Sequence, residues 1–376
     1  MAEANEASGA NGANGAGGIG HNGAGAEEQV GHISAGSEHN VVDILIVGGG
    51  PTGLFAAFYA GLRGATTKIV DSLEQLGGAV TAMYPEKYIY DVGGFPAVLG
   101  KDLITSLTQQ ASQFNPQIHL NERAERLERI PDDNVFRLET DKAVHFGKAV
   151  IICAGVGAFS PKKLDLDNLG EFEQSGTVVY FVTRNEDFRD KDILIIGGGD
   201  SAVDWALTLE PIARNISLIH RSDNFRAHAK SVDQMLNSRV NVHTHCEAAA
   251  LHGQDGKLEA VTFRHNKTKE TTTIDVEHVI MSIGFLADLG PIKTWGLEVQ
   301  KNQIVADPLT MATGIPGVWA AGDIITHPTK FKLIATGFHE AITAVNHAVV
   351  YINPKQRLSA AHSTNLDLPM KAQTEA

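Results

Sequence analysis

The sequence predicts an α/β fold of two Rossmann-like, three-layer ββα domains, the second inserted in the first. Two glycine-rich turns, GGGPTG at 48–53 and GGGDSA at 197–202, each follow a short apolar run and lead into a helix-like stretch. A dinucleotide-binding fold places its glycines in this strand–turn–helix context. Each turn is then followed by a second apolar strand, a meander and a buried strand that ends in glycine. The two halves therefore repeat one plan.

The composition sets limits on the class of protein. The chain has 376 residues, of which 43% are hydrophobic, and a net charge of −13. This length accommodates two domains with cores of their own. We find no apolar stretch of membrane-spanning length and no signal peptide, so we expect a cytoplasmic protein without a membrane partner. The negative charge, with no long basic stripe, argues against nucleic acid as a partner. Cys153 and Cys246 are far apart, so no disulfide framework is expected.

The first domain is expected over 41–160 and 286–350, behind a tail at 1–40. The tail has ten Gly, nine Ala and no Phe, Tyr or Trp, so it cannot bury enough apolar area to fold and is predicted to be disordered. A strand from 41, a helix over about 52–62 and a strand over 67–70 form the first βαβ unit. Apolar residues occur at helical spacing over residues 101–114. Residues 118–152 are predicted to form short strands, with turns at 131–134 and 141–142.

The inserted domain is expected over 161–285. Its strands lie at 193–196 and 216–219, and a meander over 257–282 closes on a buried strand at 279–284. The chain then returns to the first domain through 317–323 and a long helix over about 334–351, and 351–376 forms a C-terminal extension. The two linkers, near 160 and 286, would permit one domain to rotate on the other.

The first turn predicts a FAD site. Gly48, Gly50 and Gly53 let the backbone approach a pyrophosphate, which the helix N-terminus also attracts. The strand at 67–70 ends in Asp71, about 20 residues beyond the turn. A carboxylate there accepts hydrogen bonds from both hydroxyls of an adenosine ribose and repels a 2′-phosphate.

The second turn predicts an NADPH site. No acid ends the matching strand; His220 and Arg221 stand there instead. Arg221, helped by Arg226 and by His220, would hold a 2′-phosphate. For either turn, the alternative is an ordinary tight strand–helix connection. The predicted NADPH-binding residues are Gly197, Gly199, Asp200, Ser201, Ala202, His220, Arg221 and Arg226.

Six motifs together resemble the thioredoxin-reductase-like ferredoxin–NADP reductases, over essentially the whole chain after the tail. They are GGGPTG, LGGAVTAMYPEKYIYDVGGFP, GGGDSAVDWAL, HRSDNFRAH, AAGD and the C-terminal HST. The resemblance implies noncovalent FAD, NADPH as hydride donor, a homodimer, and ferredoxin or flavodoxin as a one-electron acceptor. The flavin would carry the chemistry, so no catalytic acid–base pair is predicted.

The resemblance also implies roles for single residues. Tyr84 would stack on one flavin face, and His362 and Thr364 would belong to an extension over the other. The long helix after Asp323 would point its N-terminus at the flavin. The chain departs from the family at Ala79, where Gln is common, and at Ser222, where a second Arg usually follows the HR pair. The predicted FAD-binding residues are Gly48, Gly50, Thr52, Gly53, Asp71, Ala79, Tyr84, Ala124, Phe159, Asp323 and Thr364.

Two other functions stay open. A thioredoxin-type disulfide reductase is disfavoured, because thiol exchange needs a proximal dithiol and the chain has no CxxC. A flavin-dependent redox sensor that docks to another protein is compatible with the same motifs. No metal site is predicted, since alternation along one strand explains the spacing of His243 and His245 beside Cys246. Lys330, Lys332 and Arg357 are the predicted basic docking residues for an acidic ferredoxin.

Overall fold

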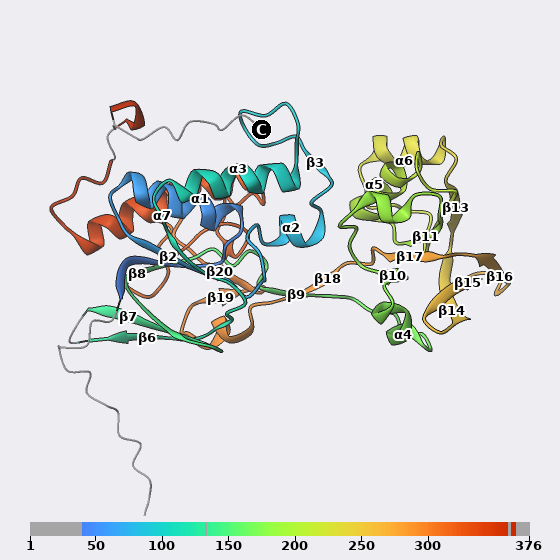
Figure 1. Ribbon diagram of the computed structural model, residues 1–376, viewed down its shortest axis with the longest axis horizontal. Coiled ribbons are helices and arrows are strands. Elements are labelled where there is room, and N and C mark those ends of the chain that lie inside the picture. The colour runs from blue at the N-terminus through green and yellow to red at the C-terminus, as the bar shows by residue number, and fades with distance from the viewer. Residues whose placement is uncertain (1–39, 132–133, 360–361, 366–376) are drawn as a thin grey trace, which may run out of the picture. The chain divides into compact units, whose positions relative to one another are not determined.

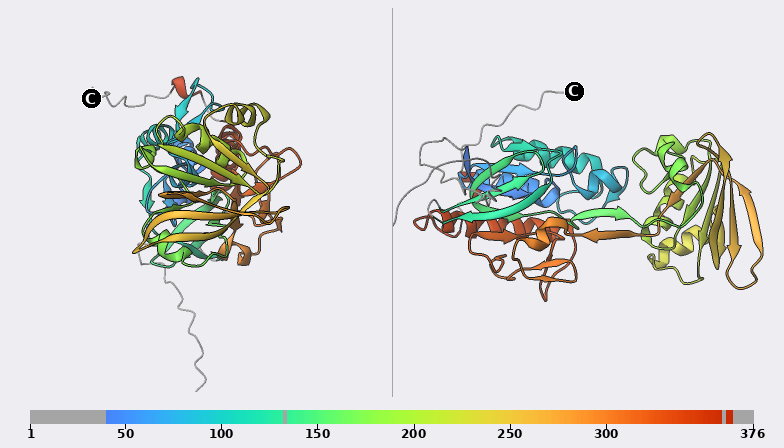
Figure 2. Two further views of the ribbon diagram at one scale, coloured as in Figure 1. Left: turned by 90° about the vertical axis from the view of Figure 1, so that its right-hand side faces the viewer. Right: turned by 90° about the horizontal axis from the view of Figure 1, so that it is seen from below.

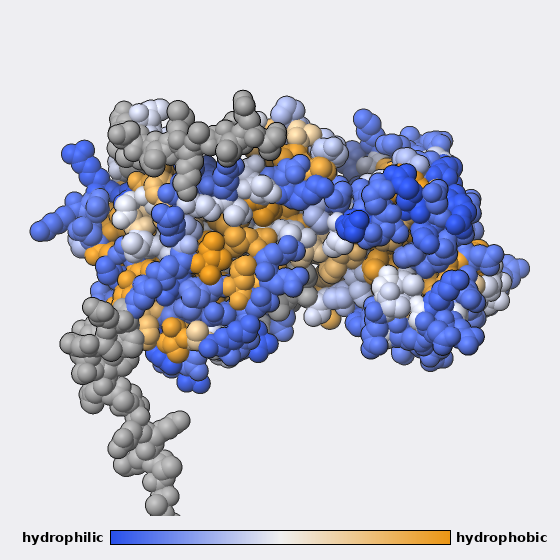
Figure 3. Space-filling model, in the orientation of Figure 1, coloured by the Kyte–Doolittle hydropathy of each residue, from blue (hydrophilic) through white to orange (hydrophobic). Residues whose placement is uncertain are grey.

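The computed structural model describes residues 40–131, 134–359 and 362–365 (Figure 1). The tail that the sequence predicts to be disordered lies outside these ranges apart from Asn40, as does the end of the C-terminal extension. Within the described residues, no helix has both the length and the apolar character needed to cross a membrane. The face in Figure 3 is mainly hydrophilic, with apolar patches between the hydrophilic regions.

A seven-stranded sheet forms the centre of the first domain. Its strand order is β5-β2-β1-β8-β7-β6, and β21 also pairs with β8. Its strands are β1 (Val41–Val47), β2 (Thr67–Val70), β5 (Gln117–His119), β6 (Ala124–Ile130), β7 (Val135–Thr140), β8 (Val144–Ile152) and β21 (Val318–Ala320). Strands β1, β2, β5, β8 and β21 run parallel, while β6 and β7 form an antiparallel extension. The central strands are continuous apolar runs because both of their faces are covered.

Three helices cover one face of this sheet. They are α1 (Pro51–Leu62), α3 (Gly100–Ser112) and α7 (Ile334–Ile352), and Figure 1 shows them side by side. β6 and β7 lie on the side away from the helices, which gives the three-layer arrangement. Short elements connect these layers: α2 (Ala79–Met83), β3 (Tyr88–Ile89), β4 (Val98–Leu99), β19 (Val299–Gln300), β20 (Gln303–Val305) and β22 (Ile325–Thr326).

A five-stranded parallel sheet organises the inserted domain, in the order β10-β17-β11-β12-β13. Its strands are β10 (Val178–Val179), β11 (Asp192–Ile196), β12 (Asn215–His220), β13 (Asn241–Thr244) and β17 (His278–Met281). Helices α5 (Asp200–Leu209) and α6 (Ala229–Leu236) pack together beside it, and α4 (Leu169–Gln174) precedes β10. A separate antiparallel sheet contains β14 (Cys246–Gln254), β15 (Lys257–His265) and β16 (Thr271–Asp275) (Figure 2).

The meander of the inserted domain begins earlier than the sequence predicts. β14 precedes the predicted start at 257 and pairs with β15 over its whole length. Its sequence, CEAAALHGQ, contains small residues and no regular alternation, and its pairing with β15 has two register shifts. Pairing with a neighbouring strand, rather than local sequence preference, therefore forms this strand.

The two linkers between the domains pair with each other. β9 (Ala158–Pro161) and β18 (Phe285–Asp288) form an antiparallel ribbon, with Leu286 opposite Ser160. The predicted hinge at 160–161 lies in this ribbon. The chain thus passes between its two parallel sheets by two hydrogen-bonded strands.

Candidate functional site

The glycines of the first turn let backbone segments approach one another more closely than side chains would permit. Gly48 has a φ of +109°, and a Cβ on it would lie 2.4 Å from the carbonyl oxygen of Cys153. A Cβ on Gly53 would lie 1.9 Å from the carbonyl oxygen of Gly48. Helix α1 starts at Pro51, and no side chain caps its N-terminus at Gly50. The uncapped amides and the glycine cradle fit a pyrophosphate.

Asp71 lies directly under this turn. It is 8% exposed. Its Oδ2 accepts a hydrogen bond from the Gly49 amide at 2.5 Å, and its Oδ1 accepts one from the Leu73 amide at 2.8 Å. Burial raises the pKa of Asp71, while these two hydrogen bonds oppose the rise. Since a carboxylate has about four acceptor sites, Asp71 keeps capacity for ribose hydroxyls.

Thr52 joins the first turn to two later segments of the chain. A Cβ on Gly322, in the AAGD turn, would lie 2.9 Å from its Oγ1, and a Cβ on Gly337, in α7, would lie 2.4 Å from the same atom. Glycine at both positions therefore lets the start of α1, the AAGD turn and the first turns of α7 meet. This meeting brings Asp323 and the start of α7 near the first glycine turn.

A cavity of about 1260 Å³ is lined by Tyr84, Asp323 and the start of α7 at 332–334. Burial raises the pKa of Tyr84 to about 12, and the carboxylates of Asp323 and Asp91 add to the rise. The phenol is therefore neutral at physiological pH. An aromatic side chain, a helix N-terminus and a carboxylate share this wall, which agrees with the predicted flavin position.

Four other predicted FAD residues, Ala79, Ala124, His362 and Thr364, lie outside the lining of this cavity. Ala79 begins α2, and Ala124 begins β6 and is half-buried. Phe159 lies in β9, paired with Ala287. His362 and Thr364 are exposed, with Thr364 in the 3₁₀ turn η3 (Ser363–Asn365). The structure thus brings Tyr84 and Asp323 to the cavity, but not His362 or Thr364.

The second glycine turn repeats the geometry of the first. A Cβ on Gly197 would lie 2.3 Å from the carbonyl oxygen of Ser282. Helix α5 starts at Asp200, again with no side-chain cap at Gly199, and Ser201 and the buried Ala202 follow in its first turn. The Asp200 carboxylate accepts a hydrogen bond from the His228 amide at 3.0 Å. The side chain of Asp200 therefore holds the loop before α6 against the start of α5.

Arg221 and Arg226 are exposed and line the same cavity as the second turn. Among residues 40–131, 134–359 and 362–365, neither guanidinium forms an ion pair with an acidic side chain. Both cations are thus available to an anionic ligand. A planar guanidinium binds a phosphate through two parallel hydrogen bonds, so the pair suits a 2′-phosphate.

His220 lines the same cavity but packs beneath the glycine turn. It is 9% exposed, and a Cβ on Gly198 would lie 2.4 Å from its ring. Its Nε2 lies 3.2 Å from Ser222 Oγ. Burial lowers the pKa of His220, and the nearby charges of Arg221 and Arg226 lower it further. A neutral ring in this place supports the turn.

Sequence reasoning missed a buried charged cluster behind the AAGD turn. Glu340 of α7 is 3% exposed, and its Oε2 accepts a hydrogen bond from the Gly322 amide at 2.8 Å. Lys330 donates to both Glu340 oxygens at 2.8 Å, and its side chain is 5% exposed. The prediction that Lys330 lies on a docking surface is therefore wrong, because its ammonium group is buried in this ion pair. Lys332 and Arg357 are exposed.

The two cysteines are free and buried. Burial raises the pKa of both thiols, and Glu340 adds to the rise at Cys153. Cys153 follows β8 of the seven-stranded sheet and Cys246 begins β14 of the antiparallel sheet, so they lie in different parts of the fold. His243 and His245 do not share a strand. His243 is in β13, while His245 lies between β13 and β14 with a φ of +57°. The explanation of their spacing by alternation along one strand is thus wrong.

Comparison with known proteins places this geometry in a family. The model of the pyridine nucleotide-disulphide oxidoreductases matches residues 42–348. The chain belongs to this family. It is 51% identical over 324 residues to a ferredoxin–NADP reductase of Halalkalibacterium halodurans, covering 86% of this chain and 97% of that one. It is also 51% identical to ferredoxin–NADP reductase 2 of Shouchella clausii, covering 87% of this chain and 98% of that one.

Among solved structures, thioredoxin reductase of Lactococcus lactis matches with a TM-score of 0.70 at 24% identity, covering 83% of this chain and 99% of that one. This likeness shows the fold. The predicted fold class, the resemblance to the reductase family and the cofactor pair of FAD and NADP(H) are confirmed. The roles of the individual site residues remain predictions.

Proposed function

We propose that the chain is a FAD-dependent ferredoxin–NADP(+) reductase, which couples hydride transfer between NADPH and FAD to one-electron transfer with ferredoxin or flavodoxin. The observation that carries the proposal is the pair of similar turns with opposite charges beside them. Asp71 is buried under the first turn, and Arg221 and Arg226 are exposed in the cavity lining beside the second. The names of the relatives at about half identity support the same activity.

The first domain would hold FAD through its own backbone and two side chains. The glycine turn and the start of α1 would bind the pyrophosphate, and Asp71 would accept hydrogen bonds from the adenosine ribose. Tyr84 would pack against the ring, where its neutral phenol adds no charge. When bound, FAD supplies the change between two-electron hydride chemistry and one-electron transfer. The N-terminus of α7 would stabilise negative charge on the flavin.

The inserted domain would hold NADPH. The turn at 197–202 and the start of α5 would bind its pyrophosphate, while Arg221 and Arg226 would bind its 2′-phosphate. Because glycines have no side chains, the backbone of this turn would let the pyrophosphate approach closely. We assign this domain to 161–285, and the FAD domain to 41–160 and 286–350.

The oligomeric state, the compartment and the electron acceptor complete the proposal. We infer a homodimer that acts in the cytoplasm, where two buried free thiols are stable. Because the chain is acidic overall, an acidic ferredoxin needs a local basic surface. Lys332 is exposed and lines the cavity, so it is the candidate that the geometry favours. Flavodoxin is the second acceptor.

A disulfide reductase is disfavoured because its chemistry needs two accessible thiols close together. Both cysteines here are buried, with raised pKa values. A redox sensor would bind the same cofactors but turn over negligibly. Turnover and thiol dependence therefore separate the three functions.

The test is NADPH-dependent reduction of ferredoxin, followed through cytochrome c, in the wild type and in a Cys153→Ala/Cys246→Ala variant. We expect sustained turnover in both proteins and no reduction of DTNB with thioredoxin present. Negligible turnover with both ferredoxin and flavodoxin would favour the sensor. Loss of turnover in a folded, FAD-loaded cysteine variant would favour thiol chemistry.

A further inference from the structure

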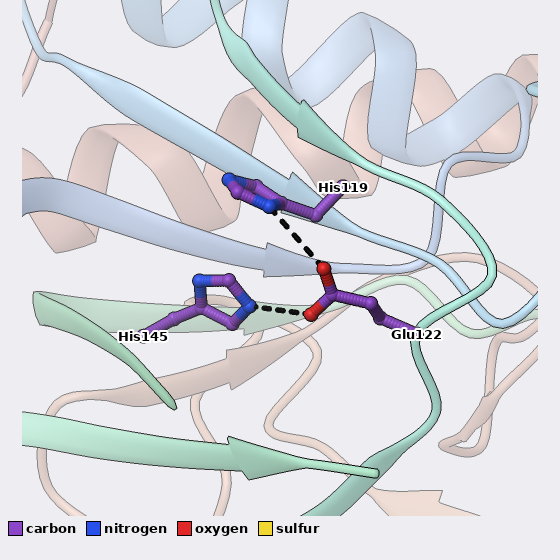
Figure 4. Close-up of side chains that lie close together, drawn as sticks. All are labelled: His119, Glu122 and His145. Atoms are coloured by element: carbon purple, nitrogen blue, oxygen red, sulfur yellow. Dashed lines mark hydrogen bonds and ion pairs between the residues drawn. The ribbon is translucent and has the colours of Figure 1, made fainter. Parts of the chain in front are cut away.

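Two histidines and a glutamate from separate segments meet in the first domain. His119 is the last residue of β5, Glu122 lies in the turn before β6, and His145 is the second residue of β8. His145 Nε2 lies 2.8 Å from Glu122 Oε2, and His119 Nδ1 lies 3.4 Å from Glu122 Oε1. Figure 4 shows both rings directed at the one carboxylate. One ligand atom from each residue can be chosen so that all three lie within 4.8 Å of one another.

The cluster is fixed on its inner side and open on its outer side. The side chain of His145 is 3% exposed, that of Glu122 is 12% exposed and that of His119 is 33% exposed. Thr140 Oγ1 donates a hydrogen bond to Glu122 Oε2 at 3.0 Å, which orients the carboxylate. The two imidazole rings lie with their centroids 4.4 Å apart. A small ion could therefore enter past His119 and meet a preformed carboxylate.

We propose that His119, Glu122 and His145 bind a divalent transition-metal ion of the zinc class. Two imidazole nitrogens and one carboxylate oxygen are a common three-ligand set for such ions, with water in the fourth position. The two nitrogen donors favour this class over magnesium or calcium, which prefer oxygen ligands. The metal would take the place of the protons that now bridge the carboxylate and the rings.

One buried cation opposes the metal. Lys68 of β2 is 4% exposed, and its charge acts on both Glu122 and His145. A second positive charge in this space weakens cation binding. The site should therefore be weaker than a closed structural zinc site, and removing the Lys68 charge should strengthen it.

The cluster is connected through the backbone to Asp71. The Asp71 amide donates to the His119 carbonyl at 2.9 Å, and the Glu122 amide donates to the Asp71 carbonyl at 2.9 Å. A metal that ties His119 to Glu122 would therefore order the segment that holds Asp71. This coupling, unlike the metal site itself, rests on the proposed FAD site. By linkage, FAD would then tighten metal binding to the same extent as metal tightens FAD binding.

Calorimetric titration of the metal-free, FAD-loaded full chain with Zn²⁺ tests the site. We expect one saturable equivalent in the wild type, and affinity at least about 100-fold weaker in His119→Asn and Glu122→Gln. The matched control is His245→Asn. His245 also lies near a carboxylate, Asp223, and near His265, so this substitution removes a comparable histidine elsewhere. It should leave the titration unchanged.

Co²⁺ absorption supplies a second readout, because a tetrahedral site with nitrogen ligands gives intense visible bands. The wild type should show these bands and His119→Asn should lose them. His119 is the most exposed ligand, so this variant should fold even where Glu122→Gln does not. Absence of saturable binding, or binding that survives His119→Asn, would overturn the proposal as adventitious coordination. Repeating the titration on apo-protein separates the metal site from the FAD site, since metal binding without FAD coupling would contradict only the coupling.

Discussion

Asp71 and Arg221 occupy equivalent positions, each directly after the second parallel strand of its βαβ unit. Asp71 follows β2 and Arg221 follows β12. Their surroundings differ as their charges do. The carboxylate is buried and fixed by two amides, whereas the guanidinium is exposed and has no acidic partner among the described residues. A hydrogen bond to a charged group contributes about 1.5–3 kcal/mol, so each position can decide which nucleotide is bound.

Asp71→Asn should weaken FAD binding by about ten- to a hundredfold, the equivalent of one charged hydrogen bond. The asparagine keeps the shape but loses the charge, and its NH₂ group cannot accept the hydrogen bond that one carboxylate oxygen now accepts from a backbone amide. FAD fluorescence on adding cofactor to apo-protein measures the Kd. Asp43→Asn is the control, because Asp43 is a carboxylate of the same sheet that accepts from the Thr66 amide. Unchanged FAD affinity in Asp71→Asn would contradict the ribose assignment.

At the scale of elements, helix α7 fixes the turn that carries Asp323. Glu340 lies on the second turn of the helix and binds both the Gly322 amide and Lys330. Gly337 lets the helix approach Thr52 of α1. These contacts therefore hold the helix start and the AAGD turn together against α1. A buried ion pair such as this one is costly to break because the remaining charge has no partner.

Glu340→Ala should lower the free energy of unfolding by about 3–5 kcal/mol, because it leaves Lys330 buried and unpaired. Combining Glu340→Met with Lys330→Met should recover much of that loss, since no charge then remains. Urea unfolding at a fixed FAD load measures both effects. His339→Ala is the control on the exposed face of the same helix. A stability of Glu340→Ala equal to that of His339→Ala would show that the pair is not buried as described.

At the scale of the whole molecule, one chain contains the same nucleotide fold twice. The two sheets are joined through β9 and β18, and the large cavity is lined by Tyr84 and Asp323 as well as by the second glycine turn. FAD and NADP(H) can therefore be bound by separate copies of one architecture. The residue that follows the second strand is an acid in one copy and an arginine in the other.

The sequence predicted those parts of the fold that depend on local pattern. The glycine turns, α1, α7 and the ends of β2 and β12 follow from residues close together in the chain. The Glu340–Lys330 pair and the cluster of His119, Glu122 and His145 were missed, because their members come from segments with no shared motif. Strand β14 was missed for a related reason, since its pairing partner and not its own sequence determines it.

The ratio of kcat/KM for NADPH over NADH in Arg221→Ala tests the central claim most directly. The claim is that an anion selects the nucleotide at the first turn and a cation selects it at the second. Arg264→Ala, which removes an exposed arginine of β15 outside the cavity lining, is the matched control. We predict that the ratio falls by about ten- to a hundredfold in Arg221→Ala and is unchanged in Arg264→Ala. A ratio in Arg221→Ala equal to that of the wild type would contradict the account.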